Sequence, residues 1–168
     1  GFAGGVVAAG LIALGHPGLA LWPLLFNRLC DGLDGAVARG SGASDRGAFL
    51  DISLDFIFYG LIPLAFALMD PAANGVYAAL LLAAFIGTGS SFLAYAILAE
   101  KRGQKSTAYP GKGFYYLGGL TEGFETMLCF VLMCLFPAWF PELALFYAGL
   151  CAITILTRLV AGWQTFGR

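Results

Sequence analysis

Four aspartates at two regular spacings carry the clearest chemical signal in this sequence. Asp31 and Asp34 are three residues apart, and Asp51 and Asp55 are four apart. Both spacings place the two carboxylates of a pair on one face of a helix. Oxygen donors of this kind favour a hard cation over zinc or copper. Four carboxylates brought together would also repel one another unless cations neutralised them. We therefore expect one or two Mg²⁺ or Mn²⁺ ions.

The elements that position these aspartates are expected to be membrane helices. Of the 168 residues, 60% are hydrophobic and 11% are charged, which is unlike a soluble domain. Apolar runs separated by short turn signals predict six helices at residues 2–14, 18–39, 47–69, 75–99, 114–136 and 142–163. The predicted fold is all-α, a six-transmembrane-helix bundle forming a single domain over residues 1–168. The chain lacks a first methionine, so we expect a truncated N-terminus.

Several function classes are disfavoured by composition. The net charge is −1 and no basic cluster is present, which argues against a nucleic-acid partner. The four cysteines form no C-x-x-C pair, so a zinc site is disfavoured. With His16 as the single histidine, a serine–histidine triad within one chain is disfavoured too.

The basic residues predict how the helices are oriented. The second predicted connection is flanked by Arg39 and Arg46, and the fourth contains Lys101, Arg102, Lys105 and Lys112. The other three connections contain no lysine or arginine. By the positive-inside rule these two connections and both termini face the cytoplasm. The second and third helices then run antiparallel, and the four carboxylates converge at the cytoplasmic rim.

The residues around the aspartates resemble a known signature. Residues 31–39 read D-G-L-D-G-A-V-A-R, and residues 47–55 read G-A-F-L-D-I-S-L-D. This string is similar to the pattern D-x-x-D-G-x-x-A-R, spacer, G-x-x-x-D-x-x-x-D of the CDP-alcohol phosphotransferases. The pattern covers 25 residues. The resemblance implies a six-helix membrane enzyme with a cytoplasmic site, and a homodimer.

The resemblance also implies an activity. A substituted phosphate group, here expected to be phosphatidyl, would pass from a CDP-linked donor such as CDP-diacylglycerol to a small alcohol acceptor, with release of CMP. We expect this in phospholipid biosynthesis, in a bacterial inner membrane.

Roles for individual residues follow from the same resemblance. Asp31, Asp34, Asp51 and Asp55 would bind the metal ions, and Asp55 would also be the general base. The candidates on the donor side are Gly35, Ala38, Arg39 and Gly47. The three small residues would leave room for the nucleotide, and Arg39 would contact a phosphate of the donor. The alternatives are helix packing for the small residues and a membrane-interface anchor for Arg39.

The acceptor side is less determined by the sequence. Its candidates are Lys112, Glu122, Glu125 and Arg158. For Lys112 the alternative is a solvated loop charge near anionic lipids. The two glutamates are three apart in an apolar segment, where a charge costs about 2.5–3.5 kcal/mol at mid-membrane and is usually functional. An ion pair with Arg158 or Arg28 is the alternative for them.

Three other readings remain open at this stage. A CDP-lipid hydrolase would use the same motif with water as the acceptor. A cation-coupled transporter would place carboxylates nearer the membrane centre. An interaction partner without activity gives no reason for retaining costly carboxylates. For the homodimer, Gly119 and Gly123 supply a weak small-xxx-small helix contact.

Overall fold

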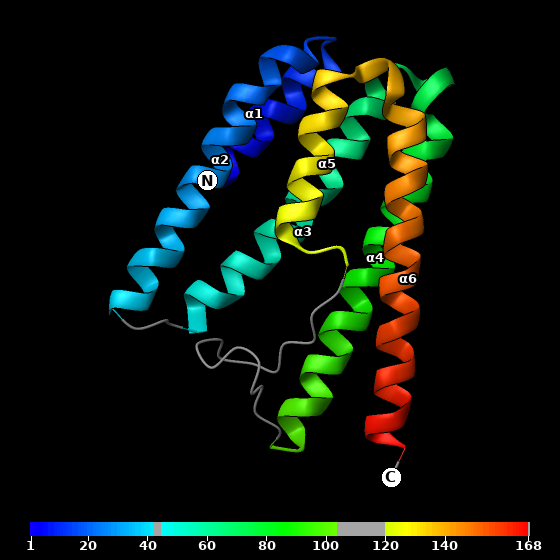
Figure 1. Cartoon of the computed structure of the whole chain (residues 1–168). Helices are drawn as coiled ribbons and strands as arrows, with labels where there is room; N and C mark the ends of the chain where they lie inside the picture. The colour runs from blue at the N-terminus through cyan, green and yellow to red at the C-terminus, as the bar shows by residue number, and fades with distance from the viewer. Residues whose placement is uncertain (42–44, 104–119, 168) are drawn as a thin grey trace.

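The described part of the chain is entirely helical. The computed structural model describes the backbone of residues 1–41, 45–103 and 120–167; the side chains of residues 31–41 are outside this description. In chain order the elements are α1 (Phe2–Ala13), α2 (Pro17–Ser41), α3 (Asp45–Met69), α4 (Pro71–Lys101), α5 (Gly123–Leu135), the 3₁₀ turn η1 (Pro137–Trp139) and α6 (Phe140–Phe166) (Figure 1). For the described residues the all-α prediction is confirmed, with a helix at each of the six predicted places, while a bundle of six membrane spans stays a prediction.

Length and apolar composition together separate the six helices into two groups. Among the described residues, three segments are long and apolar enough to cross a membrane: Asp45–Met69, Pro71–Lys101 and Pro137–Phe166. The apolar helices α1 and α5 have 12 and 13 residues. That gives each a length of about 20 Å, against roughly 30 Å of hydrocarbon. The fold thus has three candidate spans, and its other three helices are shorter or, in α2, more charged.

The start of the fifth helix differs from the prediction. Residues 120–122 are not helical and α5 begins at Gly123, while residues 114–119 lie outside the described chain. The physical reason is a capping box. The Glu122 side chain accepts from the backbone of Glu125, and the Glu125 carboxylate accepts from the Glu122 backbone N–H at 3.1 Å. This exchange satisfies N–H groups that would otherwise lack partners at a helix start.

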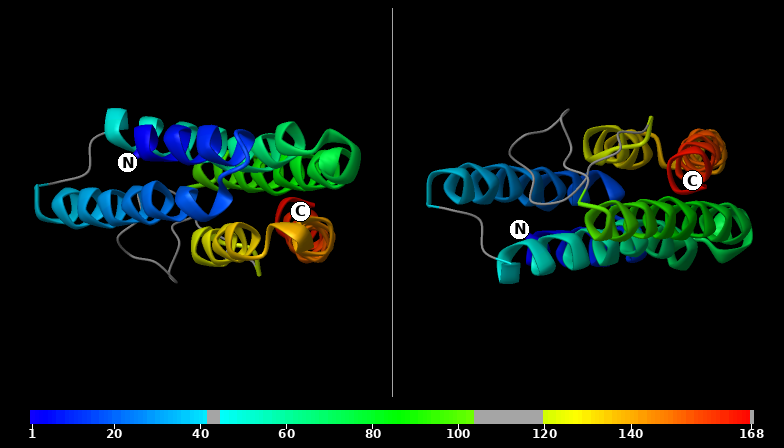
Figure 2. Two further views of the ribbon diagram at one scale, coloured as in Figure 1. Left: turned by 90° about the horizontal axis from the view of Figure 1, so that it is seen from above. Right: turned by 90° about the horizontal axis from the view of Figure 1, so that it is seen from below.

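The helices close into a ring around an interior space. One row contains α1, α3 and α4, and the other contains α2, α5 and α6 (Figure 2). Contacts between α1 and α2 and between α4 and α6 join the two rows. Each helix therefore has its most extensive contacts with two others, and the motif helices α2 and α3 are each packed against α1.

Two glycines explain how α1 fits between the motif helices. A Cβ at Gly4 would lie 2.9 Å from the carbonyl oxygen of Pro23 in α2, and a Cβ at Gly5 would overlap the Phe58 ring of α3. Because glycine has no side chain, α1 can approach both helices closely. This contact sets the separation of α2 and α3 near the site.

Buried aromatic rings pack in the interior of the bundle and extend up to the cavity. Phe58 and Phe85 each meet Phe130 nearly edge to face, with centroids 5.9 and 6.1 Å apart. Phe66 stacks on Phe140 at 4.4 Å. These rings come from α3, α4, α5 and α6, so the apolar core ties both rows together.

The two ends of the bundle differ in what they contain. The α1–α2, α3–α4 and α5–α6 turns gather at one end, and the last turn of α2 and the first turn of α3 lie toward the other, as do the C-termini of α4 and α6 (Figure 1). The α1–α2 turn lies at residues 14–16, with Gly15 at φ +83°, and α2 begins at Pro17, one residue before the predicted start. At the α3–α4 turn, Asp70 caps α4 by accepting from the Ala73 N–H at 3.0 Å. The second and fourth connections contain residues outside the described chain, so the orientation predicted from the basic residues stays a prediction.

Candidate active site

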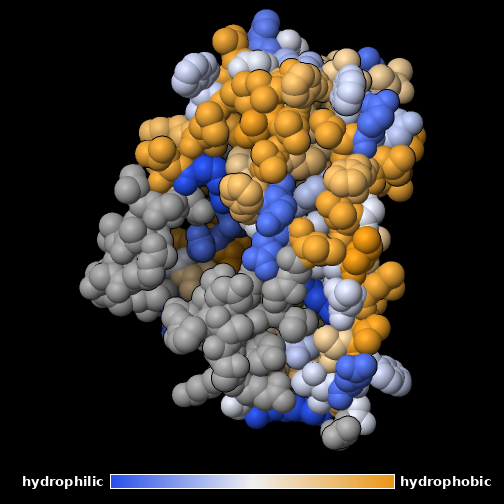
Figure 3. All heavy atoms as spheres, in the orientation of Figure 1, coloured by the Kyte–Doolittle hydropathy of each residue, from blue (hydrophilic) through white to orange (hydrophobic). Residues whose placement is uncertain are grey.

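A cavity of about 300 Å³ opens inside the ring beside the second half of the motif. Five of the helices contribute to its wall: Arg28 from α2; Ile52, Asp55, Phe56 and Tyr59 from α3; Phe85, Thr88 and Phe92 from α4; Thr121, Glu122, Gly123 and Thr126 at α5; Cys151 and Arg158 from α6. On the face shown in Figure 3, hydrophilic side chains lie above and beside a hollow, below an apolar area. The wall of the cavity is mixed, with charged and hydroxyl side chains among aromatic and aliphatic ones.

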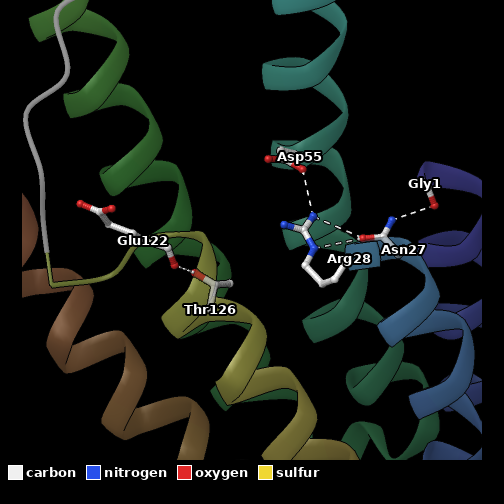
Figure 4. A network of polar contacts seen from close by, with 6 residues as sticks. All are labelled: Gly1, Asn27, Arg28, Asp55, Glu122 and Thr126. Carbon is white, nitrogen blue, oxygen red and sulfur yellow. Dashed lines mark hydrogen bonds and ion pairs between the residues drawn. The ribbon is translucent and has the colours of Figure 1, made fainter. Parts of the chain in front are cut away.

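Asp55 reaches this cavity and carries an ion pair to α2. Arg28 Nη2 lies 3.3 Å from Asp55 Oδ1, and both side chains are partly exposed (Figure 4). The next carboxylate of the motif helix, Asp51, lies one turn earlier and is exposed. Gly47 lies one further turn back and is also exposed. The three positions predicted on α3 therefore follow one face of the helix.

Opposite Asp55, a buried arginine defines the far wall. Arg158 is 7% exposed, donates from Nη1 to the Thr88 carbonyl oxygen at 3.0 Å, and lies 5.4 Å from the centre of the Phe92 ring. Burying a guanidinium costs free energy unless the group is hydrogen-bonded or paired, and a buried charge in a membrane protein usually has a function. The structure places this predicted acceptor residue and the predicted base on the same cavity.

Thr121 and Thr126 contribute hydroxyl groups to the wall, and hydroxyls of α6 lie behind them. Thr121 Oγ1 donates to Thr154 Oγ1 at 3.1 Å, and the Thr126 and Tyr147 hydroxyls are 2.7 Å apart. Thr154, Thr126 and Tyr147 are all buried. Buried hydroxyls retained in such a network provide donors and acceptors next to the cavity.

The two predicted acceptor glutamates have different positions. Glu122 lines the cavity and is the N-cap of α5, while Glu125 is exposed and belongs to the capping box. The interpretation of both as side chains along one face of a long apolar helix is wrong, because the helix starts between them. Glu122 stays a candidate for acceptor binding; the position of Glu125 is explained by helix capping.

The remaining predicted residues fall outside the described side chains. Asp31, Asp34, Gly35, Ala38 and Arg39 are backbone positions in the last three turns of α2. Lys112 lies in residues 104–119, outside the description altogether. Convergence of the four aspartates stays a prediction.

The carboxylates that are described suit a divalent metal by chemistry. Asp51 and Asp55 offer oxygen donors one turn apart, which fits Mg²⁺ or Mn²⁺. Among residues with described side chains, no group of three or more histidine, cysteine, aspartate or glutamate residues is close enough to hold an ion. A complete site would require ligands from α2 as well, where the motif supplies Asp31 and Asp34.

Several lining residues escaped sequence reasoning. Tyr59, Thr88, Phe92 and Thr121 belong to ordinary apolar or polar runs, and nothing in their spacing distinguishes the cavity side from the lipid side. The position of Arg28 in the sequence could have indicated its place at the site. It lies three residues before Asp31, on the same helix, and sequence reasoning offered it as a partner of the glutamates.

Comparison with known proteins agrees with the motif and the helical fold. Residues 2–163 match the family model described as CDP-alcohol phosphatidyltransferase, and the chain belongs to this family. A related protein is "Inner membrane protein YnjF" of Escherichia coli (strain K12), 55% identical over 165 residues. The alignment covers 98% of this chain and 80% of that protein. No solved structure matches the chain.

Proposed function

We propose that this protein transfers a phosphatidyl group, or a similar substituted phosphate, from a CDP-linked donor such as CDP-diacylglycerol to a small alcohol. CMP would be the leaving group. Family membership and the motif support the reaction class. The observation that carries the proposal is the cavity, because it joins motif residue Asp55 to a buried arginine and a hydroxyl-lined wall.

The donor and the metal ions belong to the motif side of the cavity. We propose that Asp31, Asp34, Asp51 and Asp55 bind two Mg²⁺ or Mn²⁺ ions. These ions would neutralise the pyrophosphate charge and stabilise the departing CMP. The nucleotide and its phosphates would then lie along Gly35, Ala38, Arg39 and Gly47. Oxygen donors at motif spacing support this assignment.

The acceptor alcohol belongs in the cavity. Its hydroxyl oxygen would attack the phosphorus that carries the lipid substituent, the bond from that phosphorus to the CMP oxygen would break, and the hydroxyl proton would pass to the Asp55 carboxylate. A volume of about 300 Å³ suits a small alcohol. Glycerol 3-phosphate is our first candidate, with Arg158 and Glu122 at the acceptor side; Lys112 and Glu125 remain weaker candidates.

The membrane arrangement extends the same proposal. We propose that all six helices cross or enter an inner membrane, with the motif and both termini on the cytoplasmic side. The start of α3, which carries Arg46, and the end of α4, which carries Lys101, lie toward the same end of the bundle, and this supports the arrangement (Figure 1). The homodimer stays a proposal from the family alone. Gly123 lends it no support, since a Cβ there would lie 3.3 Å from the Tyr59 hydroxyl inside the bundle.

The decisive experiment measures CMP release from CDP-diacylglycerol by the purified protein. Mg²⁺, Mn²⁺ and EDTA are compared across a panel of alcohols that includes glycerol 3-phosphate. Metal-dependent release that rises with one alcohol, together with a new lipid product, supports the transferase and names its acceptor. Release that is indifferent to every alcohol would indicate a hydrolase instead. Absence of release from folded protein would reject this donor.

A further inference from the structure

A charged residue outside the family motif contacts the proposed base. Arg28 lies on α2, three residues before Asp31, and its Nη2 atom is 3.3 Å from Asp55 Oδ1 on α3. We propose that Arg28 is a positioning residue that fixes the orientation of the Asp55 carboxylate. This inference rests on the proposed function and adds a residue that the motif does not contain.

Arg28 is itself held in place from a second side. Its Nε and Nη2 atoms both donate to Asn27 Oδ1 at 3.3 Å. Asn27 is 4% exposed and donates from Nδ2 to the Gly1 carbonyl oxygen at 2.8 Å. The guanidinium also lies 5.8 Å from the centre of the Phe58 ring. A side chain with these contacts has few rotamers available, so it can impose a direction on a partner.

The two carboxylate oxygens of Asp55 point in different directions, and only one of them faces Arg28. Oδ1 is the oxygen that faces the guanidinium, and in Figure 4 the other oxygen points away from Arg28. A carboxylate tethered at one oxygen presents the other in a fixed direction. Such pre-orientation is what a proton acceptor or metal ligand requires.

Stability gives a weaker explanation for this ion pair. The two side chains are 23% and 34% exposed, and pairs of this kind contribute little to folding. An orienting role instead predicts a large effect on turnover, because small misplacement of a reacting group costs up to about 100-fold.

The test compares Arg28→Gln, Arg28→Lys and wild type by CMP release. We expect Arg28→Gln to lower kcat about 10- to 100-fold, with unchanged KM for donor and acceptor. Arg28→Lys should recover part of the loss, since it keeps the charge but not the fork. The matched control is Arg102→Gln, which also removes interhelical bonds, from Arg102 to the Thr165 and Phe166 carbonyls at 2.9 Å. It should leave kcat unchanged.

The results that would overturn the role of Arg28 differ from those that would overturn the proposed function. A wild-type kcat in Arg28→Gln would overturn the inference. A rise in KM alone would also overturn it, by making Arg28 a substrate-binding residue. If wild type releases no CMP, the proposed function fails, and the tether is tested by Mn²⁺ binding to wild type, Arg28→Gln and Arg102→Gln. A dissociation constant raised about 10-fold or more in Arg28→Gln alone would support the tether, and an unchanged one would overturn it.

Discussion

At the scale of single residues, the two carboxylates of α3 lie in different surroundings. Asp51 is exposed, whereas Asp55 is partly buried against Arg28 and lines the cavity. The same residue type at one-turn spacing therefore has two environments. We interpret Asp51 as a metal ligand only, and Asp55 as a ligand that also faces the acceptor.

Replacing Asp51 by asparagine should abolish transfer. The substitution keeps the shape and removes the ligand charge, so we expect a loss greater than about 100-fold, since residues that merely support a ligand cost about 10- to 100-fold. CMP release by purified protein measures this. The control is Asp45→Asn, which removes an exposed carboxylate in the first turn of the same helix and should leave activity unchanged. Appreciable activity in folded Asp51→Asn would contradict the metal assignment.

The Asp55→Asn substitution should separate turnover from binding. An amide cannot accept the hydroxyl proton, so kcat should fall to background while CDP-lipid still binds. Equilibrium binding of the donor, measured beside CMP release, checks this. Loss of donor affinity in proportion to the loss of turnover would make Asp55 chiefly a ligand.

At the scale of elements, two local features determine how the helices present the cavity. The capping box at Glu122 and Glu125 fixes where α5 begins, and therefore where Thr121 and Thr126 lie. A glycine in α4 allows the close approach of α3. Each feature can be tested by one substitution and a matched partner.

Loss of the cap should destabilise α5 without a specific effect on the acceptor. Glu125→Ala removes the carboxylate that accepts from the Glu122 N–H, and we expect a loss of about 0.5–2 kcal/mol in the free energy of unfolding. Glu125→Gln keeps an acceptor at that place and should retain stability. Unfolding of detergent-solubilised protein measures both. An acceptor KM that rises in Glu125→Gln would instead restore the predicted acceptor role.

Filling the α3–α4 contact should disturb the site through Phe56. A Cβ at Gly89 would lie 2.7 Å from the Phe56 ring, next to Asp55, so Gly89→Ala requires the ring or helix to shift. We expect lower melting temperature and lower kcat. The control is Gly149→Ala in α6, where no atom lies within 4 Å of the added carbon. Equal effects of the two substitutions would show that helix propensity, and not packing, is responsible.

At the scale of the whole molecule, the ring of helices brings together residues that are far apart in sequence. Asp55 on α3 and Arg158 on α6 line one cavity, and the buried arginine is held through Thr88 on α4. The helices thus bring charged and hydroxyl side chains together in a cavity between their own side chains.

This arrangement predicts that Arg158 acts on the acceptor side. Arg158→Gln removes the buried charge, and a charged hydrogen bond is worth about 1.5–3 kcal/mol. We therefore expect the KM of a phosphorylated acceptor to rise roughly tenfold or more, with the donor KM unchanged. Steady-state kinetics with each substrate varied in turn measure this. A rise in donor KM alone would place Arg158 on the donor side.

The order of the helices, most of their limits and the motif could be predicted from the sequence; the start of α5 could not. These depend on local properties: apolar runs, turn residues and the three- and four-residue spacings that place side chains on one helical face. The sequence could not determine that α1 packs between α2 and α3, that Arg28 reaches Asp55, or that Glu122 and Glu125 cap α5. In a membrane helix the lipid-facing and core-facing sides are both apolar, so hydropathy does not distinguish them. Only the packing of complete helix faces decides which polar residues share the cavity.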